Sequence, residues 1–133
     1  MFDFLRRIFG PSGAQSGTLT REYNTTIAGI DHAANGVALV RQLRVGDRLR
    51  LLREPENPHD KNALAVVNAE GQRLGYIPAR IAADVSRALD DDGGKIGPVK
   101  VMEKTAEGRD QKRFNAVVQF HLTRQRRRTS PRH

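Results

Sequence analysis

The sequence has no cysteine and few aromatic residues, which make up 5 % of the chain. Without cysteine it has no disulfide framework, no thiolate metal site and no cysteine nucleophile, which suits a reducing compartment. Long apolar runs are also absent, because the segment at residues 2–9 is far shorter than the roughly 20 apolar residues that span a membrane. These absences predict a cytoplasmic protein whose core is built largely from Val, Ile, Leu and Ala.

Acidic residues are too few to balance the basic ones. The 23 Lys and Arg against 15 Asp and Glu give a net charge of +8, which favours a polyanionic partner or an acidic membrane surface. Most of the excess lies at one end, because residues 124–133 hold five arginines and no acid, whereas residues 23–123 hold fifteen basic and thirteen acidic residues. The net charge is therefore weak evidence for a specific site.

Composition divides the chain into three segments. Residues 1–20 combine an amphipathic stretch at 2–9 with a flexible linker rich in Ser and Gly. Residues 21–123 have the strand and turn pattern of one compact domain, and residues 124–133 are typical of a disordered basic tail that serves solubility or non-specific phosphate contact. For residues 2–9 we favour a frayed or back-packed terminal turn, and a helix that docks on a membrane or on a partner protein is the alternative.

Short strands separated by turn residues predict a mainly β domain. The carboxyl end of its longer helix should fray, because three consecutive aspartates oppose the helix dipole there. About six strands with one or two short helices predict a small, partly open OB-like β-barrel. We expect strands at residues 23–30, 48–53, 62–68, 72–77, 98–105 and 114–123, helices at 35–43 and 79–89, and a polar, mobile loop at 106–113.

No enzyme motif is present. The glycine pairs lack the strand, helix and lysine context of a phosphate-binding loop, and there is no G-x-S-x-G nucleophile elbow. Two acid–imidazole pairs, Asp31-His32 and His59-Asp60, are candidates for a metal-assisted nuclease, but adjacent residues seldom bind one ion. We favour a turn role for Asp60 and an exposed loop position for His59. No catalytic residue, metal ligand or cofactor is predicted, and the nuclease stays an alternative.

The loop between the second and third expected strands contains a specific motif. Arg53-Glu-Pro-Glu-Asn-Pro-His-Asp-Lys-Asn-Ala63 is followed by Gly71-Gln-Arg-Leu-Gly-Tyr-Ile-Pro78. Together with Ile27-Ala-Gly-Ile30, this pattern resembles the HIRAN domain family over about residues 22–122. The resemblance implies an OB-like barrel and a non-enzymatic DNA-binding module of replication-fork or DNA repair, since the family's characterised member captures the 3′-hydroxyl end of single-stranded DNA. It also implies a helicase or nuclease that acts in trans.

By position, the family's aromatic–aspartate pair falls on His59 and Asp60. The resemblance implies that the Asp60 carboxylate accepts a hydrogen bond from the terminal hydroxyl, while the His59 imidazole stacks on a base or sugar. His32 stands where the characterised member has part of an arginine–tyrosine pair. The remaining predicted DNA contacts are polar, aromatic or basic residues, namely Asn57, Lys61, Tyr76, Arg80, Arg48, Arg50 and Arg53.

Several of these residues have a structural interpretation as well. Tyr76 stacks on DNA or lies at the barrel rim, and the arginines of the strand at 48–53 hold phosphate or form a solvated face. Phe114 and Phe120 alternate with smaller apolar residues, which favours the core over a DNA platform. A protein-interaction or membrane-associated adaptor that uses residues 2–9 remains the main alternative to DNA binding.

Overall fold

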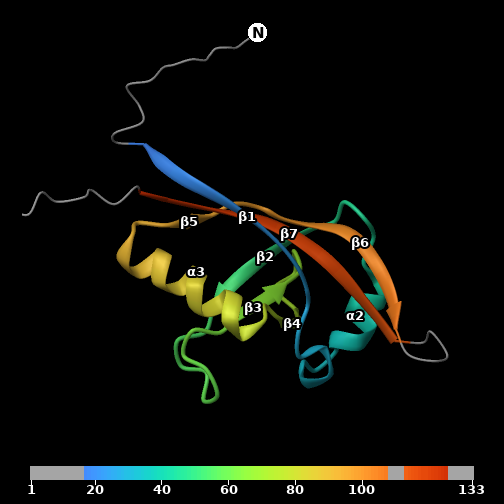
Figure 1. Ribbon diagram of the computed structural model, residues 1–133. Coiled ribbons are helices and arrows are strands. Elements are labelled where there is room, and N and C mark those ends of the chain that lie inside the picture. The colour runs from blue at the N-terminus through green and yellow to red at the C-terminus, as the bar shows by residue number, and fades with distance from the viewer. Residues whose placement is uncertain (1–16, 108–112, 126–133) are drawn as a thin grey trace, which may run out of the picture.

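A computed structural model describes residues 17–107 and 113–125. Six antiparallel strands follow the order β1-β7-β6-β2-β3-β4, and the two-residue strand β5 pairs with β7 (Figure 1). The strands are β1 (Thr18–Thr26), β2 (Arg48–Arg53), β3 (Leu64–Val67), β4 (Arg73–Tyr76), β5 (Lys95–Ile96), β6 (Val99–Glu107) and β7 (Arg113–Gln125). The helices are the 3-10 turn η1 (Ile30–His32), α2 (Gly36–Gln42) and α3 (Ala79–Asp91).

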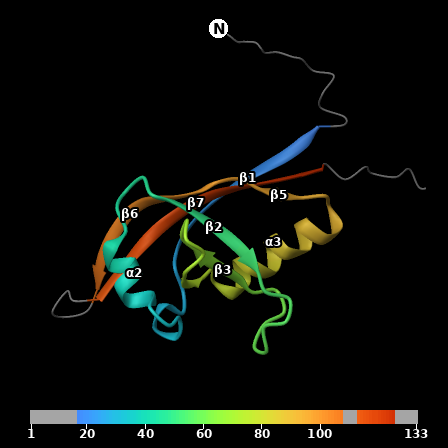
Figure 2. The same ribbon diagram turned by 180° about the vertical axis from the view of Figure 1, so that it is seen from behind.

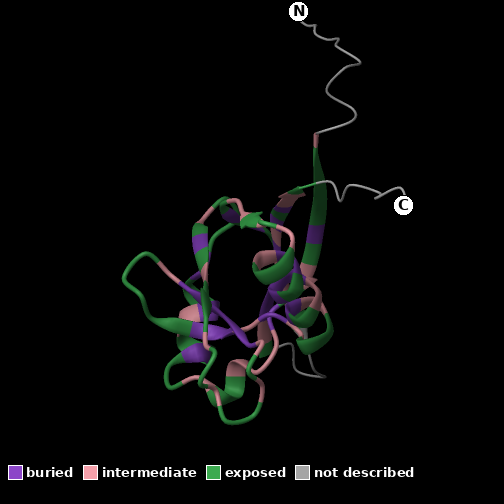
Figure 3. Ribbon diagram, turned by 90° about the vertical axis from the view of Figure 1, so that its left-hand side faces the viewer, coloured by how far each residue is buried: buried purple, intermediate pink, exposed green. Residues whose placement is uncertain are grey.

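The sheet curls into half of a barrel, and α2 and α3 lie on the same side of the long strands toward opposite ends (Figures 1 and 2). This arrangement confirms the mainly β, partly open barrel predicted from the sequence. Its core is aliphatic with one fully buried ring, that of Phe120, which stacks on Tyr23 at a centroid distance of 5.1 Å. β3 is buried along its whole length, as its nearly continuous apolar run predicts (Figure 3).

The first strand differs from its predicted position. β1 begins at Thr18, inside the segment expected to be a linker, and ends at Thr26 rather than at residue 30. Its length is set by the ladder with β7, in which Thr18 lies opposite Gln125 and Thr26 opposite Val117. Beyond Thr26 the backbone of Ile27 is bonded by the Asn115 side chain, which accepts from the Ile27 N–H at 3.1 Å and donates to its carbonyl at 3.0 Å. A side chain therefore replaces the ladder at this point.

The carboxyl ends of α3 and β7 also extend beyond their predictions. α3 runs to Asp91, and two acids at its carboxyl end lie next to cations. Asp90 pairs with Arg53, and Asp92 lies 3.8 Å from Arg124. These cations offset the unfavourable placement of acids at a helix carboxyl end. Arg124 belongs to β7, so the basic segment begins inside the sheet. The predictions for residues 1–16, 126–133 and most of the loop at 106–113 lie outside the described residues.

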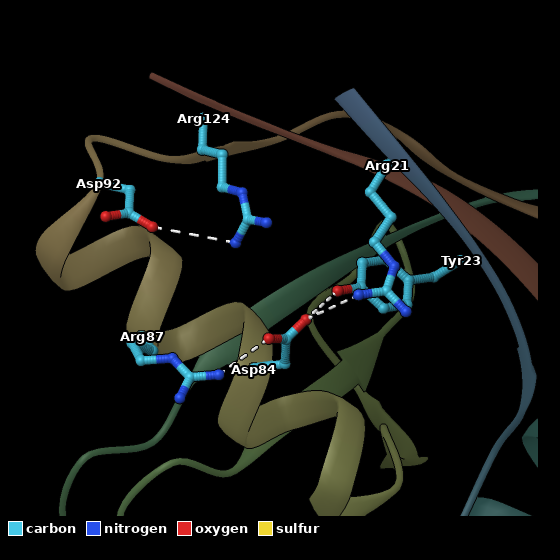
Figure 4. A network of polar contacts seen from close by, with 6 residues as sticks. All are labelled: Arg21, Tyr23, Asp84, Arg87, Asp92 and Arg124. Carbon is cyan, nitrogen blue, oxygen red and sulfur yellow. Dashed lines mark hydrogen bonds and ion pairs between the residues drawn. The ribbon is translucent and has the colours of Figure 1, made fainter. Parts of the chain in front are cut away.

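A polar network fastens β1 to α3 (Figure 4). The Asp84 carboxylate accepts hydrogen bonds from the Tyr23 hydroxyl, from Arg21 at 3.4 Å and from Arg87 at 3.0 Å. The Arg21 guanidinium also lies over the Tyr23 ring, 4.8 Å from its centroid. The Tyr23 hydrogen bond is the main cause that holds the pKa of Asp84 below its ordinary value. The side of the sheet that faces α3 is thus tied by paired charges.

Candidate functional site

Residues 54–63 connect β2 to β3 without helix or strand; residues 54–61 were predicted to form this loop, whereas residues 62 and 63 were expected to belong to the strand. The shape of the loop is set by Asn57, whose side-chain oxygen accepts the backbone N–H groups of His59 at 2.8 Å and Asp60 at 3.1 Å. The Asn57 amide nitrogen donates to Glu54 Oε1 at 3.1 Å. Asn side chains readily close such turns on their own backbone. Asn57 therefore holds the loop in one conformation and presents the residues that follow it.

Asp60 closes the second turn of this loop. Its Oδ1 accepts the Asn62 N–H at 2.9 Å, and its backbone carbonyl accepts the Ala63 N–H at 3.0 Å. The Asn62 carbonyl in turn accepts the Ser86 hydroxyl of α3 at 3.1 Å, which anchors the loop to the helix. The other carboxylate oxygen, Oδ2, has no hydrogen-bond partner among the residues that the structure describes. The turn role expected for Asp60 therefore uses one of its two oxygens.

The Glu54 carboxylate organises the opposite side of the loop. Its Oε1 accepts the Tyr76 hydroxyl at 2.9 Å and its Oε2 accepts the Arg73 guanidinium, so both residues of β4 are linked to the loop. Burial acts to raise the pKa of Glu54, but the hydrogen bonds from Asn57, Arg73 and Tyr76 outweigh it, and the pKa lies below its usual value. Burial, followed by the bond to Glu54, raises the pKa of Tyr76. At neutral pH this cluster holds an ionised carboxylate and a protonated phenol.

Two open clefts flank the loop. One has a volume of about 550 Å³ and is lined by Glu54 to Pro58 together with Arg73 and Tyr76. The other has a volume of about 450 Å³ and includes Lys61 beside Arg53. Pro55 lines both clefts, so the loop forms the wall between them. Of the predicted site residues, Asn57 and Tyr76 meet in the first cleft, and Lys61 and Arg53 meet in the second.

β4 brings η1 next to this site. Ala28 and Tyr76 exchange two backbone hydrogen bonds of 2.7 Å each, outside the main ladder. Gly75 permits this approach, because a Cβ at its position would lie 2.6 Å from the Ala28 carbonyl oxygen. The chain then turns at Gly29, whose φ of 64° favours glycine, and enters η1 with His32 exposed. His32 therefore lies on a segment that is fastened to the Tyr76 edge of the sheet.

The predicted arginines lie in different surroundings. Arg53 forms a two-pronged pair with Asp90 of α3, at 2.9 and 3.1 Å, and is engaged within the fold. Arg80 is exposed in the first turn of α3. Arg48 and Arg50 are exposed on the outer face of β2, as the alternation of that strand predicts. The structure thus separates the three arginines of β2 into one structural ion pair and two open cations.

Two residues of the site were missed by the sequence analysis, Glu54 and Arg73. Glu54 stands within the motif, and its place before Pro55 gave no sign of a partner. Arg73 reaches the outer face through a bulge between β3 and β4, where the register shifts by one residue at Val66 and Val67. A bulge of this kind redirects a side chain and leaves no clear trace in the hydrophobic pattern. These contacts therefore needed the register of the folded sheet.

Several other predicted features lie outside this site. Phe120 lies in the core, as predicted, and Phe114 packs against it. Within residues 17–107 and 113–125 no group of three or more His, Asp or Glu side chains is placed to hold a metal ion. Neither α2 nor α3 is long and apolar enough to cross a bilayer. The amphipathic stretch at residues 2–9 lies outside the described residues.

Comparison with known proteins gives a consistent result. The HIRAN domain model matches residues 20–123. The Fanconi-associated nuclease 1 homolog of Arabidopsis thaliana is 40 % identical over 52 residues, which are 39 % of this chain and 6 % of that protein. The helicase-like transcription factor of Mus musculus is 44 % identical over 45 residues, 34 % of this chain and 4 % of that protein. The chain thus spans only a small fraction of these relatives.

Two crystal structures share the architecture. A protein from Lactobacillus plantarum superposes with a TM-score of 0.60 at 23 % identity, covering 81 % of this chain and 99 % of the other. The HIRAN domain of human HLTF superposes with a TM-score of 0.59 at 21 % identity, covering 81 % of this chain and 80 % of the other. At these identities the likeness establishes the fold.

Proposed function

The chain belongs to the HIRAN domain family, and we propose that it is a DNA-binding module that holds the 3′-hydroxyl end of single-stranded DNA at the β2–β3 loop. The observation that carries this proposal is the Asp60 carboxylate. One oxygen closes a turn, while Oδ2 has no partner among the described residues and belongs to a half-buried side chain. An ionised carboxylate is an acceptor only, so it suits a terminal hydroxyl, which can donate a hydrogen bond.

The charge of the loop favours an end over continuous backbone. Between Glu54 and Lys61 the chain has three carboxylates and one ammonium group, a net charge of −2. A 3′-phosphate would add up to two negative charges beside Asp60, whereas a hydroxyl adds none. The loop is therefore suited to discriminate between these two ends, and phosphate binding must come from cations around it.

Residues next to Asp60 supply the remaining contacts of the proposal. His59 is exposed at the tip of the loop and offers a flat ring to a base or sugar. Lys61 lies in the loop and Arg80 in the first turn of α3, and both are exposed cations that suit phosphate contacts. Tyr76 has its hydroxyl bound to Glu54, so we assign it a stacking role beside His32 rather than a phosphate contact.

The relatives support a nucleic-acid partner. One is named a nuclease and the other a helicase-like transcription factor, and the matched segment is a small part of each. We extend the nucleic-acid context to this chain, with DNA repair as the setting and a helicase or nuclease acting in trans as the partner enzyme. The module itself is proposed to bind DNA and to catalyse no reaction.

The test compares affinities for two oligonucleotides that differ only in a 3′-hydroxyl or a 3′-phosphate end. We expect the wild-type protein to prefer the hydroxyl by about tenfold to a hundredfold, since a hydrogen bond to a charged group contributes about 1.5–3 kcal/mol. Asp60→Asn keeps an acceptor for the Asn62 N–H but replaces the free oxygen by a donor, and it should abolish the preference. Glu56→Gln removes the same charge from an exposed side chain of the same loop, and as the matched control it should lower the preference much less than Asp60→Asn.

The outcomes separate cleanly. Loss of the preference in Asp60→Asn, with most of the preference retained in Glu56→Gln, supports end capture. Equal affinity of the wild-type protein for both ends, or a preference that survives Asp60→Asn, contradicts it and leaves binding by charge alone.

A further inference from the structure

The outer face of β2 connects the proposed end-binding loop to a second group of residues. Because side chains alternate along a strand, Arg48, Arg50 and Leu52 point outward, and Glu54 continues this series into the loop. The Glu54 N–H bonds the Ala63 carbonyl at 3.0 Å, so the ladder persists to this residue. The successive cross-strand rows of this face are Lys100–Arg48, Arg50–Val67–Arg73 and Leu52–Ala65–Tyr76.

Three cations on this face have no acidic partner. Arg48 of β2 lies directly opposite Lys100 of β6, and Arg50 follows two residues later. All three are exposed, and none forms an ion pair with any residue in the described part of the chain. Like charges directly opposite one another destabilise a sheet, so this placement conflicts with folding. Such conflicts between local rules and the fold are expected where a surface binds a ligand.

We infer that Arg48, Arg50 and Lys100 form a track that binds the phosphate backbone of the single-stranded DNA leading to the end held at the loop. This basic track rests on the proposed function, because its occupant is the same strand. It adds a direction: the strand would leave the loop, pass Tyr76 and Leu52, and continue along β2 toward β6.

The spacing and chemistry of the rows fit this path. Glu54 and Arg50 are four residues apart on an extended strand, which corresponds to about 13 Å. Between them lies Leu52, an apolar side chain that is 45 % exposed, in one row with the Tyr76 ring and only the small Ala65 between. Single-stranded DNA is bound by surfaces of this composition, where apolar or aromatic faces contact bases and cations contact phosphates.

The charges of the loop and of the basic track are complementary to different parts of one ligand. The loop is acidic and would repel phosphate, whereas the basic track lacks acids and would attract it. An acidic polypeptide would match the basic track but gains nothing from the loop. A DNA strand with a free 3′-hydroxyl matches both, so we commit to it as the occupant.

The experiment measures affinity against salt concentration for oligonucleotides of about 4 and about 16 nucleotides, the range of site sizes for OB-like folds. Both carry the same 3′-hydroxyl end. Each phosphate contact to single-stranded DNA contributes about 0.7 to the slope of log affinity against log salt. For the longer oligonucleotide, R48Q/R50Q should therefore reduce the slope by about 1.4, and adding K100Q should reduce it by about 2 in total.

A matched control keeps the change of net charge. R87Q/K95Q removes one exposed cation from α3 and one from β5, away from the face of β2, and should leave the slope within about 0.7 of wild type. R48Q/R50Q should weaken binding of the short oligonucleotide clearly less than binding of the long one, because the few phosphates of the short one reach at most the near end of the basic track. Thermal melting of each variant confirms that it is folded.

Each remaining outcome rejects the basic track. If R48Q/R50Q leaves the salt slope of the long oligonucleotide unchanged, the proposed basic track is wrong. If R48Q/R50Q weakens the short and the long oligonucleotide equally, the arginines contact the 3′ end itself. If R87Q/K95Q lowers the salt slope as much as R48Q/R50Q does, only the net charge of the protein matters. Polyglutamate that competes as well as the long oligonucleotide would assign the surface to acidic polypeptides. Failure of the proposed end capture is seen separately, as loss of the 3′-hydroxyl preference in the short oligonucleotide.

Discussion

The two sides of this small sheet treat charge in opposite ways. Toward α3, each aspartate that faces the sheet meets a cation: Asp84 has Arg21 and Arg87, and Asp90 has Arg53. On the outer face of β2 and β6, Arg48 lies beside Lys100, and neither forms an ion pair with an acid in the described part of the chain. Both arrangements use the same strand, because Arg53 and Arg50 are three residues apart on β2. Paired charge here holds the fold together, and unpaired charge lies on the surface that we propose to bind DNA.

The largest effect on stability is expected from Asp84, which lies at the centre of the paired charges. Asp84→Ala removes the acceptor of three hydrogen bonds and leaves the largely buried Tyr23 hydroxyl without an acceptor. We expect the free energy of unfolding to fall by about 2 kcal/mol, measured by urea denaturation. DNA affinity of the folded variant should not change, because Asp84 lies on the α3 side.

Two controls define this result. Asp91→Ala removes an exposed acid of the same helix and should cost less than about 0.5 kcal/mol. In a Tyr23→Phe background the cost of Asp84→Ala should shrink, because the two residues share one hydrogen bond. An equal cost in both backgrounds would contradict the assigned network.

A smaller change in stability is expected when the pH is lowered, because the Asp84 carboxylate then becomes protonated. The hydrogen bond from Tyr23 is the first cause that lowers the pKa of Asp84 below 3.8 in the folded state. A carboxyl with a depressed pKa stabilises the fold above its unfolded value and loses that contribution as pH falls through the folded pKa. The stability difference between wild type and Asp84→Ala should therefore be constant near neutral pH and shrink below pH 3.8. A difference that grows on acidification would show the opposite sign of linkage.

The smallest effect should appear on the unpaired side, with the opposite sign. Lys100→Gln removes one of two like charges that face each other across β2 and β6, and should raise the free energy of unfolding by about 0.5 kcal/mol at low salt. Added salt should erase the gain by screening. Lys95→Gln, on β5 opposite Thr123, should leave stability unchanged. A destabilised Lys100→Gln protein would mean that the cations do not conflict with the fold.

The alternation of β2 shows what the sequence predicts well. Arg48, Leu49, Arg50 and Leu51 alternate in charge and hydrophobicity, so both the limits of the strand and its outer face were predicted correctly. The same alternation places Arg53 on the inner side, yet its partner Asp90 is far along the chain. Such a pairing depends on where α3 packs, which no local pattern specifies.

In the candidate site, too, the local turn could be predicted from the sequence and the contacts between strands could not. The turn role of Asp60 followed from the chemistry of Asn and Asp in a proline-rich loop. The cluster of Glu54, Arg73 and Tyr76 did not, because a one-residue slip in a strand moves a side chain to the other face of the sheet. The bulge that turns Arg73 outward is a property of the paired strands, and local sequence carries no equivalent signal.

The ladder between β1 and β7 has a consequence for how the molecule is made. Thr26 lies opposite Val117, so the first strand cannot complete its pairing until the last one is available. Contacts this distant in sequence form slowly, because the closure entropy of a long intervening segment is lost before they are gained. On the ribosome, the β2–β3 loop would emerge well before β7. The chain should therefore expose the β2–β3 loop, the proposed DNA-end site, early, and the sheet behind it should be completed only when the final strand pairs.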